Sequence, residues 1–228
     1  MSTAISLNNG FGIVLDDPTN AIGANYSAFV RDMNWVVDVL TYYINFTAPL
    51  TFAINVRPAA QNPYGNTEGL VPATGVTWIF NNNNQATLAS IVKGQTGADP
   101  NGAQSELGFT FYLASDGGLK NYGCPLWFDP DPILGLTPTI PSGKHDFCSI
   151  ALHETLHCLG FATFATANAP WNQRIISEEG ANYYHSAAIS AILGGDLPIQ
   201  PDSSNTGFVS DHIGNTSIAY QPIKSDLM

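Results

Sequence analysis

Basic residues are scarce in this sequence. Lysine and arginine together number seven, against eighteen aspartates and glutamates, which gives a formal net charge of −11 over 228 residues. A surface that binds nucleic acid or an anionic membrane needs clustered positive charge, and the few basic residues here are scattered along the chain. We therefore expect neither nucleic acid nor an anionic membrane surface among the partners.

Long apolar runs are also missing. No segment approaches the roughly 20 apolar residues that a membrane-spanning helix needs, so we expect no membrane span. The start, MSTAISLNNG, has neither the basic region nor the apolar core of a signal peptide. The low lysine content, with abundant Asn, Gly, Ser and Thr, is nevertheless typical of exported proteins. We predict a secreted protein whose export route is not visible at this N-terminus.

Cysteine is the third scarce residue type, with three in the chain, at Cys124, Cys148 and Cys158. The last two lie on one predicted helix, separated by roughly 15 Å at about 1.5 Å per residue. This separation is too large for a disulfide. Two alternatives stay open: one bridge with Cys124 at one end, or three thiols.

The remaining composition is that of a folded globular protein, with 44% hydrophobic residues and enough length for one domain built of two lobes. We predict an α+β fold, with a twisted mixed sheet and packed helices in residues 1–160 and a loop-rich second part in residues 161–228. Apolar periodicity and turn residues predict strands at 11–17, 50–58, 75–81 and 107–114, and helices at 26–44, 85–93, 147–159 and 178–193.

The helix predicted at 147–159 carries the pattern H-E-x-x-H, formed by His153, Glu154 and His157, and Gly160 ends it. At 3.6 residues per turn the two histidines share one helix face and can bind one zinc ion at about 2.0 to 2.1 Å. Glu154 lies one step round the helix, where a general base toward a zinc-activated water belongs. With five histidines in the chain, chance would produce the pattern on the order of 0.002 times. We predict one catalytic Zn²⁺.

A hydrolytic zinc site has three protein ligands and one exchangeable water, so a third ligand is required. His145 precedes the helix and is expected at the surface, and His185 lies in a predicted tyrosine-rich helix and is expected to be structural. Glu178 is a serious rival, because its E-x-x-A context resembles the second helix of the thermolysin-like gluzincins. His212 lies in a polar segment, GFVSDHIGN, that can fold back to the site.

The segment HDFCSIALHETLHCLGF, together with the later AILGGDLPIQ, SDHI and SDLM, resembles the leishmanolysin-type metzincins and their bacterial relatives over about residues 144–228. In that family an insertion separates the zinc helix from a third histidine, and a methionine follows in a turn below the metal. The resemblance implies that His212 is the third ligand, Met228 the Met-turn methionine and Gly160 the turn glycine. Compact metzincins hold their third histidine where this chain has Thr163.

These residues predict a monomeric zinc-dependent endopeptidase with a metzincin-like fold and a protein or peptide substrate. We expect a substrate strand to pair with an exposed sheet edge supplied by residues near Leu107 to Asp129. Two alternatives stay open. One is a gluzincin-like zinc peptidase with Glu178 as the third ligand, and the other is a non-catalytic zinc protein in which Asp211 completes a closed site.

Overall fold

The structure is a computed structural model of the chain, and it describes residues 2–62, 69–72, 78–80, 86–121, 123–134, 139–161, 172–178, 181–187 and 197–199. The chain divides into two compact units. The first unit is Met1–Thr77 with Leu88–Leu159, and the second is Trp78–Thr87 with Gly160–Met228. The sequence did not predict that Trp78–Thr87 would belong to the second unit. That both units form one catalytic domain stays a prediction.

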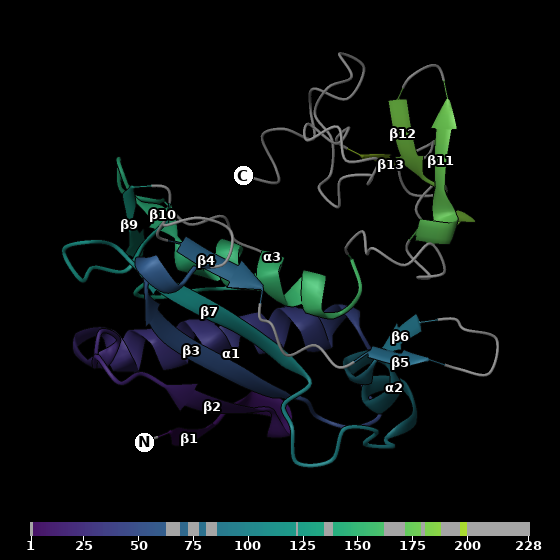
Figure 1. Cartoon of the computed structure of the whole chain (residues 1–228), viewed down its shortest axis with the longest axis horizontal. Coiled ribbons are helices and arrows are strands. Elements are labelled where there is room, and N and C mark those ends of the chain that lie inside the picture. The colour runs from purple at the N-terminus through teal and green to yellow at the C-terminus, as the bar shows by residue number, and fades with distance from the viewer. Residues whose placement is uncertain are drawn as a thin grey trace. The chain divides into compact units, whose positions relative to one another are not determined.

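The first unit is built on a five-stranded sheet whose strands follow the order β1-β2-β3-β7-β4 (Figure 1). The three inner strands are parallel, and β1 and β4 run antiparallel to their neighbours at the two edges. The strands predicted at 11–17, 50–58 and 107–114 are confirmed, whereas β1 and β4 were not predicted. The strand bounds are β1 Thr3–Ser6, β2 Gly12–Asp16, β3 Thr51–Pro58, β4 Gly69–Pro72 and β7 Leu107–Leu113.

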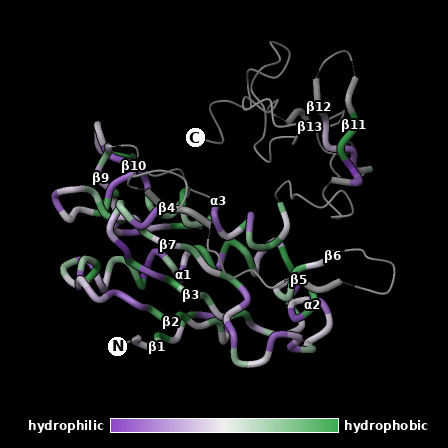
Figure 2. Tube along the Cα trace, viewed as in Figure 1, coloured by the Kyte–Doolittle hydropathy of each residue, from purple (hydrophilic) through white to green (hydrophobic). Residues whose placement is uncertain are grey.

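Two helices cover one face of this sheet: α1 (Tyr26–Tyr43) and α3 (Phe147–Cys158). The ring of Phe111 on β7 lies 6.4 Å from the ring of Phe29 on α1 and 5.8 Å from that of Phe147 on α3. Both helices therefore pack on the side of the sheet to which Phe111 points. Hydrophobic segments recur along β2, β3, α1 and α3 in Figure 2, as burial of one shared core requires. Both helices confirm the sequence prediction to within one residue at each end.

The expected substrate edge near Leu107 to Asp129 is contradicted for Leu107–Leu113, whereas Lys120–Asn121, later in that range, is an outer strand of a small separate sheet. β7 lies between β3 and β4, so it is an inner strand, and all seven of its residues are buried. The strands that follow, β8 (Lys120–Asn121) and β9 (Cys124–Trp127), belong to a separate small sheet in which β9 also pairs with β10 (His145–Asp146). The outermost strand on this side of the five-stranded sheet is β4. Hydrophobic pattern alone does not determine strand order, which is why the sequence did not indicate this edge.

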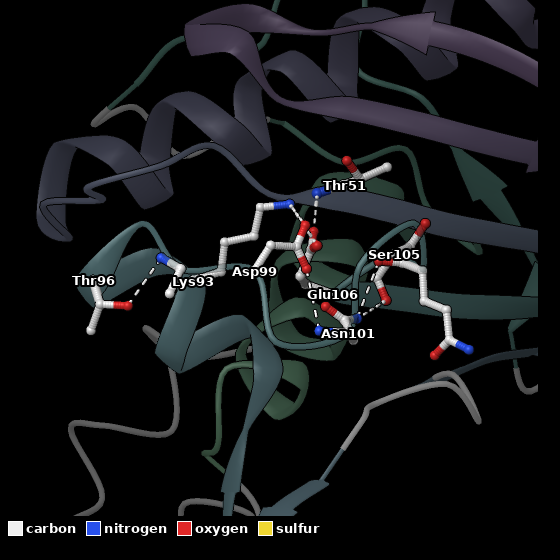
Figure 3. A network of polar contacts seen from close by, with 9 residues as sticks. Thr51, Lys93, Thr96, Asp99, Asn101, Ser105 and Glu106 are labelled. Atoms are coloured by element: carbon white, nitrogen blue, oxygen red, sulfur yellow. Dashed lines mark hydrogen bonds and ion pairs between the residues drawn. The ribbon is translucent and has the colours of Figure 1, made fainter.

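A polar network fixes helix α2 (Ala89–Thr96) to the start of the neighbouring strands (Figure 3). Lys93 Nζ lies 2.7 Å from Glu106 Oε1 and 2.9 Å from Asp99 Oδ2. The second oxygen of Glu106 accepts a hydrogen bond from the backbone nitrogen of Thr51, at 2.8 Å. Burial acts to lower the pKa of Lys93, but the bonds to Glu106 and Asp99 prevail and raise it. The helix predicted at 85–93 begins only at Ala89, because residues Ala86–Leu88 form a strand.

The described part of the second unit contributes to a two-stranded sheet and contains a three-stranded sheet. The helix predicted at 178–193 is wrong over its first seven residues, because Glu178 ends strand β11 and Ala181–Tyr184 form strand β12. In this sheet Ile175 pairs with Tyr184 and Ile176 with Tyr183, side chains that favour strands. Residues 188–196 lie outside the described part. The strand bounds are β5 Trp78–Phe80, β6 Ala86–Leu88, whose last residue belongs to the first unit, β11 Ile175–Glu178, β12 Ala181–Tyr184 and β13 Leu197–Ile199.

Short 3₁₀ turns join several of these elements. Between β1 and β2 the chain turns at Asn9, whose φ of 54° lies in the left-handed region that asparagine tolerates better than most residues. This turn folds β1 back onto β2. The 3₁₀ segments are η1 Asn8–Gly10, η2 Gly23–Asn25, η3 Ala59–Gln61 and η4 Asn172–Arg174.

Candidate metal centre

The candidate centre is carried by helix α3, whose ends are defined by local chemistry. Asp146 is the N-cap, and its Oδ2 accepts hydrogen bonds from the backbone nitrogen of Ser149 at 2.9 Å and from its hydroxyl at 2.6 Å. An N-cap carboxylate satisfies amide groups that the helix leaves unpaired. At the other end Gly160 has a φ of 97°, a conformation that glycine adopts without strain. The predicted start and stop of this helix are confirmed.

His153 and His157 face each other on successive turns of α3. Their Nε2 atoms are 3.0 Å apart, and the rings are nearly perpendicular, at 83°. Two nitrogens at this separation can both lie 2.0 to 2.1 Å from one ion with an angle of about 94° between them, and a small side-chain adjustment reaches the tetrahedral value. The pair therefore fits a zinc ion as two of its ligands.

Glu154 lies beside this pair and is the one acidic side chain within α3. It is 8% exposed, whereas His153 is exposed and His157 is half-buried. A carboxylate adjacent to a metal position and shielded from bulk water suits proton transfer better than one in solvent, because competing water is excluded. On this helix the candidate base is therefore buried, whereas the two candidate ligands are exposed or half-buried.

Aromatic packing holds the first turn of α3. The Phe147 ring lies 5.8 Å from Phe29, 5.8 Å from Phe111 and 4.9 Å from Phe128, so that three different segments contact it. Contacts of this kind resist rotation of the helix about its axis, because the surrounding core is close-packed. The direction in which the histidines project is thereby fixed by residues more than one turn away.

A buried polar cluster lies next to this turn. Asp32 on α1 is fully buried, and it accepts hydrogen bonds from the Cys148 thiol and from the backbone nitrogen of Asp129, the latter at 3.0 Å. Arg31 lies beside it, with Nε 3.3 Å from Oδ1. Burial raises the pKa of Asp32 to about 7, although Arg31 acts in the opposite direction. Burial, with the nearby Asp32 charge, also raises the pKa of the Cys148 thiol. Sequence reasoning did not find Asp32, because its hydrogen-bond partners Asp129 and Cys148 lie far along the chain, Asp129 at a separation of 97 residues.

The three cysteines, all within the described part of the chain, are thiols, which decides between the two alternatives left open by the sequence. Two of them belong to α3. Cys158, in its last turn, is completely buried and donates a hydrogen bond from Sγ to the carbonyl oxygen of Gly108 on β7, at 3.1 Å. Together with the Cys148 bond to Asp32, this gives both α3 thiols a structural partner.

Not every predicted site residue is described. His212, Met228, Asp211 and Thr163 lie outside the described residues. Among the residues that are described, no group of three or more His, Cys, Asp or Glu side chains is gathered for a metal ion. The structure therefore brings together His153, Glu154 and His157, and the third ligand stays a prediction.

The other candidate ligands occupy strands and loops rather than the predicted positions. His145 is half-buried in β10, opposite Leu126 of β9, and is not the surface residue that the sequence predicted. His185 follows strand β12, where its backbone nitrogen donates to the carbonyl of Arg174 at 2.7 Å. Its predicted place within a helix is wrong. Glu178 ends strand β11, so the gluzincin-like helix context is wrong as well.

Comparison with known proteins adds no relative: no family model, no curated protein and no solved structure matches this chain. The resemblance to the leishmanolysin-type metzincins is carried by the motif and its spacing. In the part of the chain that the structure describes, no helix is long and apolar enough to cross a membrane.

Proposed function

We propose that this protein is a zinc-dependent endopeptidase of the metzincin class. The observation that carries the proposal is the pair of imidazole nitrogens 3.0 Å apart on a helix whose intervening sequence places Glu154 directly beside them. Two histidines one turn apart with a glutamate after the first is the arrangement by which helical metalloprotease motifs bind zinc and supply a general base. A closed structural site has no use for that glutamate.

In this proposal His153 and His157 bind the ion from the helix, and His212 completes the ligand set. When bound, zinc polarises the carbonyl of the scissile peptide and makes a water molecule more acidic. Glu154 accepts the proton that this water loses as it attacks the peptide carbon. Glu154 then donates the proton to the leaving amine, which returns the carboxylate to its starting state.

The substrate would bind as an extended strand along β4. This strand is outermost in the five-stranded sheet, and it packs against α3, which carries the two histidines. Addition of a strand to a sheet edge uses backbone hydrogen bonds, so the affinity depends little on the substrate sequence. Pockets for individual side chains would then determine where the enzyme cuts.

Cleavage of a protein substrate tests the proposal. The purified chain should contain one zinc per molecule and degrade casein or gelatin. Chelation should abolish the cleavage, and added zinc should restore it. One tightly bound zinc without any cleavage would favour the non-catalytic zinc protein, and absence of bound zinc would contradict both functions.

A further inference from the structure

The end of the proposed zinc helix is held by a residue from a different helix. The hydroxyl of Ser90, in the first turn of α2, donates a hydrogen bond to the backbone carbonyl oxygen of Cys158 at 2.7 Å. Cys158 is the last residue of α3 and directly follows His157. Ser90 and Cys158 are both completely buried. The bond therefore joins two elements at the point where the helix stops.

This carbonyl has a particular need for a partner. The last four carbonyl groups of an α-helix find no N–H donor within the helix. The Cys158 carbonyl is closed to solvent, so water cannot replace the serine hydroxyl.

Cys158 is held at its side chain as well as at its backbone. Its thiol donates to Gly108 on β7, so the residue is fixed between α2 and the central sheet. His157 is its neighbour in the chain, whereas His153 lies a full turn earlier, in the part of α3 fixed by Phe147. Loosening of the last turn would move one histidine of the pair and leave the other in place.

We propose that Ser90 is a positioning residue for the metal centre, which fixes the last turn of α3 so that His157 stays at its metal-binding distance from His153. This inference rests on the proposed zinc function. Ser90 itself touches neither metal nor substrate. Ser90 would act on the metal centre indirectly, by holding the imidazole nitrogens of His153 and His157 at the separation that zinc binding needs.

The test compares zinc affinity across variants of the whole chain. Ser90→Ala removes the hydroxyl and should weaken zinc binding about tenfold, the lower end of the range for residues that orient metal ligands. Cys158→Ala should also weaken binding, because it removes the second anchor. Cys158→Ser keeps a donor and should restore binding to within about twofold of the wild type. Affinity is measured by competition with a chromophoric chelator, at a temperature where circular dichroism shows each variant folded.

Ile13→Val provides the matched control. It removes a buried methyl group from β2, which β3 separates from β7, and so destabilises the same unit away from α3. This variant should lose thermal stability while keeping the zinc affinity of the wild type. If Ser90→Ala behaves like Ile13→Val, with lower stability and unchanged zinc affinity, the positioning role is overturned and the serine is merely structural.

The outcome also separates this inference from the proposed function. A wild-type chain that binds no zinc would overturn the zinc peptidase proposal and the positioning role with it. A wild-type chain that binds zinc and cleaves protein, alongside a Ser90→Ala variant with the same zinc affinity and the same kcat, would overturn only the positioning role. Weaker zinc binding in Ser90→Ala and Cys158→Ala, reversed in Cys158→Ser, supports it.

Discussion

The Nε2 atoms of His153 and His157 lie 3.0 Å apart on successive turns of α3. In the absence of an ion, one ring must donate a hydrogen to the other at this distance. A shared cation lets both nitrogens act as acceptors toward it. The 3.0 Å approach is therefore compatible with a hydrogen bond between the rings and with a shared cation, and the proposed zinc site uses the second arrangement.

Loss of either histidine of this pair should abolish tight zinc binding. We expect His157→Ala to weaken zinc affinity by more than about 100-fold, beyond the effect of losing a residue that only orients a ligand. His185→Ala is the control, because His185 is exposed beyond strand β12 and should have no effect on affinity. Zinc titration against a competing chelator measures both. Equal affinity in the two variants would exclude His157 as a ligand.

The third ligand can be assigned by comparing two variants. We expect His212→Ala to lower zinc occupancy greatly, because the resemblance makes His212 the third ligand, and Glu178→Ala to leave it unchanged. Metal analysis after dialysis against buffer of low free zinc gives the occupancies. The opposite result would assign the site to the gluzincin-like arrangement, with Glu178 as the ligand.

Asp32 should make the stability of the protein depend on pH. Its pKa of about 7 in the folded state lies above the ordinary value of 3.8, so between these values the folded protein holds a proton that the unfolded chain releases. The Asp32 contribution to stability is present at low pH and falls as pH rises through this window, by up to about 1.4 kcal/mol per pH unit.

Asp32→Asn removes this titration. The difference in unfolding free energy between wild type and variant should therefore change steadily across the window. Urea unfolding at about pH 5, 6 and 7 measures it. A difference that stays constant across these pH values would show that Asp32 does not titrate there. The comparison with the variant cancels the contributions of groups that both proteins share.

The Lys93 network should contribute measurably to stability. Glu106 is 1% exposed and bonded to both Lys93 and Thr51, so Glu106→Gln leaves the half-buried Lys93 ammonium group with Asp99 as its remaining charged partner in this network. We expect a loss of about 1 to 3 kcal/mol, below the value for a fully enclosed pair because Lys93 is partly exposed. The double variant Lys93→Met/Glu106→Gln should lose less than the sum of the two single variants.

Asp116→Asn serves as the control for that measurement, because Asp116 pairs with Lys120 on an exposed turn. Its loss of stability should be much smaller than that of Glu106→Gln. Denaturant unfolding of Lys93→Met, Glu106→Gln, the double variant and Asp116→Asn measures these losses of stability. Additive effects of the Lys93 and Glu106 changes would show that the two side chains do not interact energetically.

Local patterns predicted the elements that carry the candidate centre. Helix α3 was predicted from the Asp146 cap, the Gly160 stop and a continuous apolar surface, and α1 from its three- and four-residue apolar spacing. Caps and periodicity act over a few residues, which is why the sequence displays them. The same local information placed His153, Glu154 and His157 on one helix.

The features that the sequence did not predict depend on contacts between distant segments. Strand order made β4 the sheet edge instead of β7, and the partners of Asp32 and Ser90 are 97 and 68 residues away. In the second unit, strand pairing of Ile175 with Tyr184 and of Ile176 with Tyr183 outweighed the weak helical pattern of the sequence. Local propensity is readily overridden by such tertiary pairing.

The central claim is most directly tested by measuring zinc content and peptide cleavage together for the wild type and Glu154→Gln. The substitution keeps the size of the side chain and removes its capacity to accept a proton. The account predicts one zinc per chain in both proteins and loss of cleavage by roughly 100-fold or more in the variant. Full cleavage activity in Glu154→Gln, with zinc bound, would contradict it.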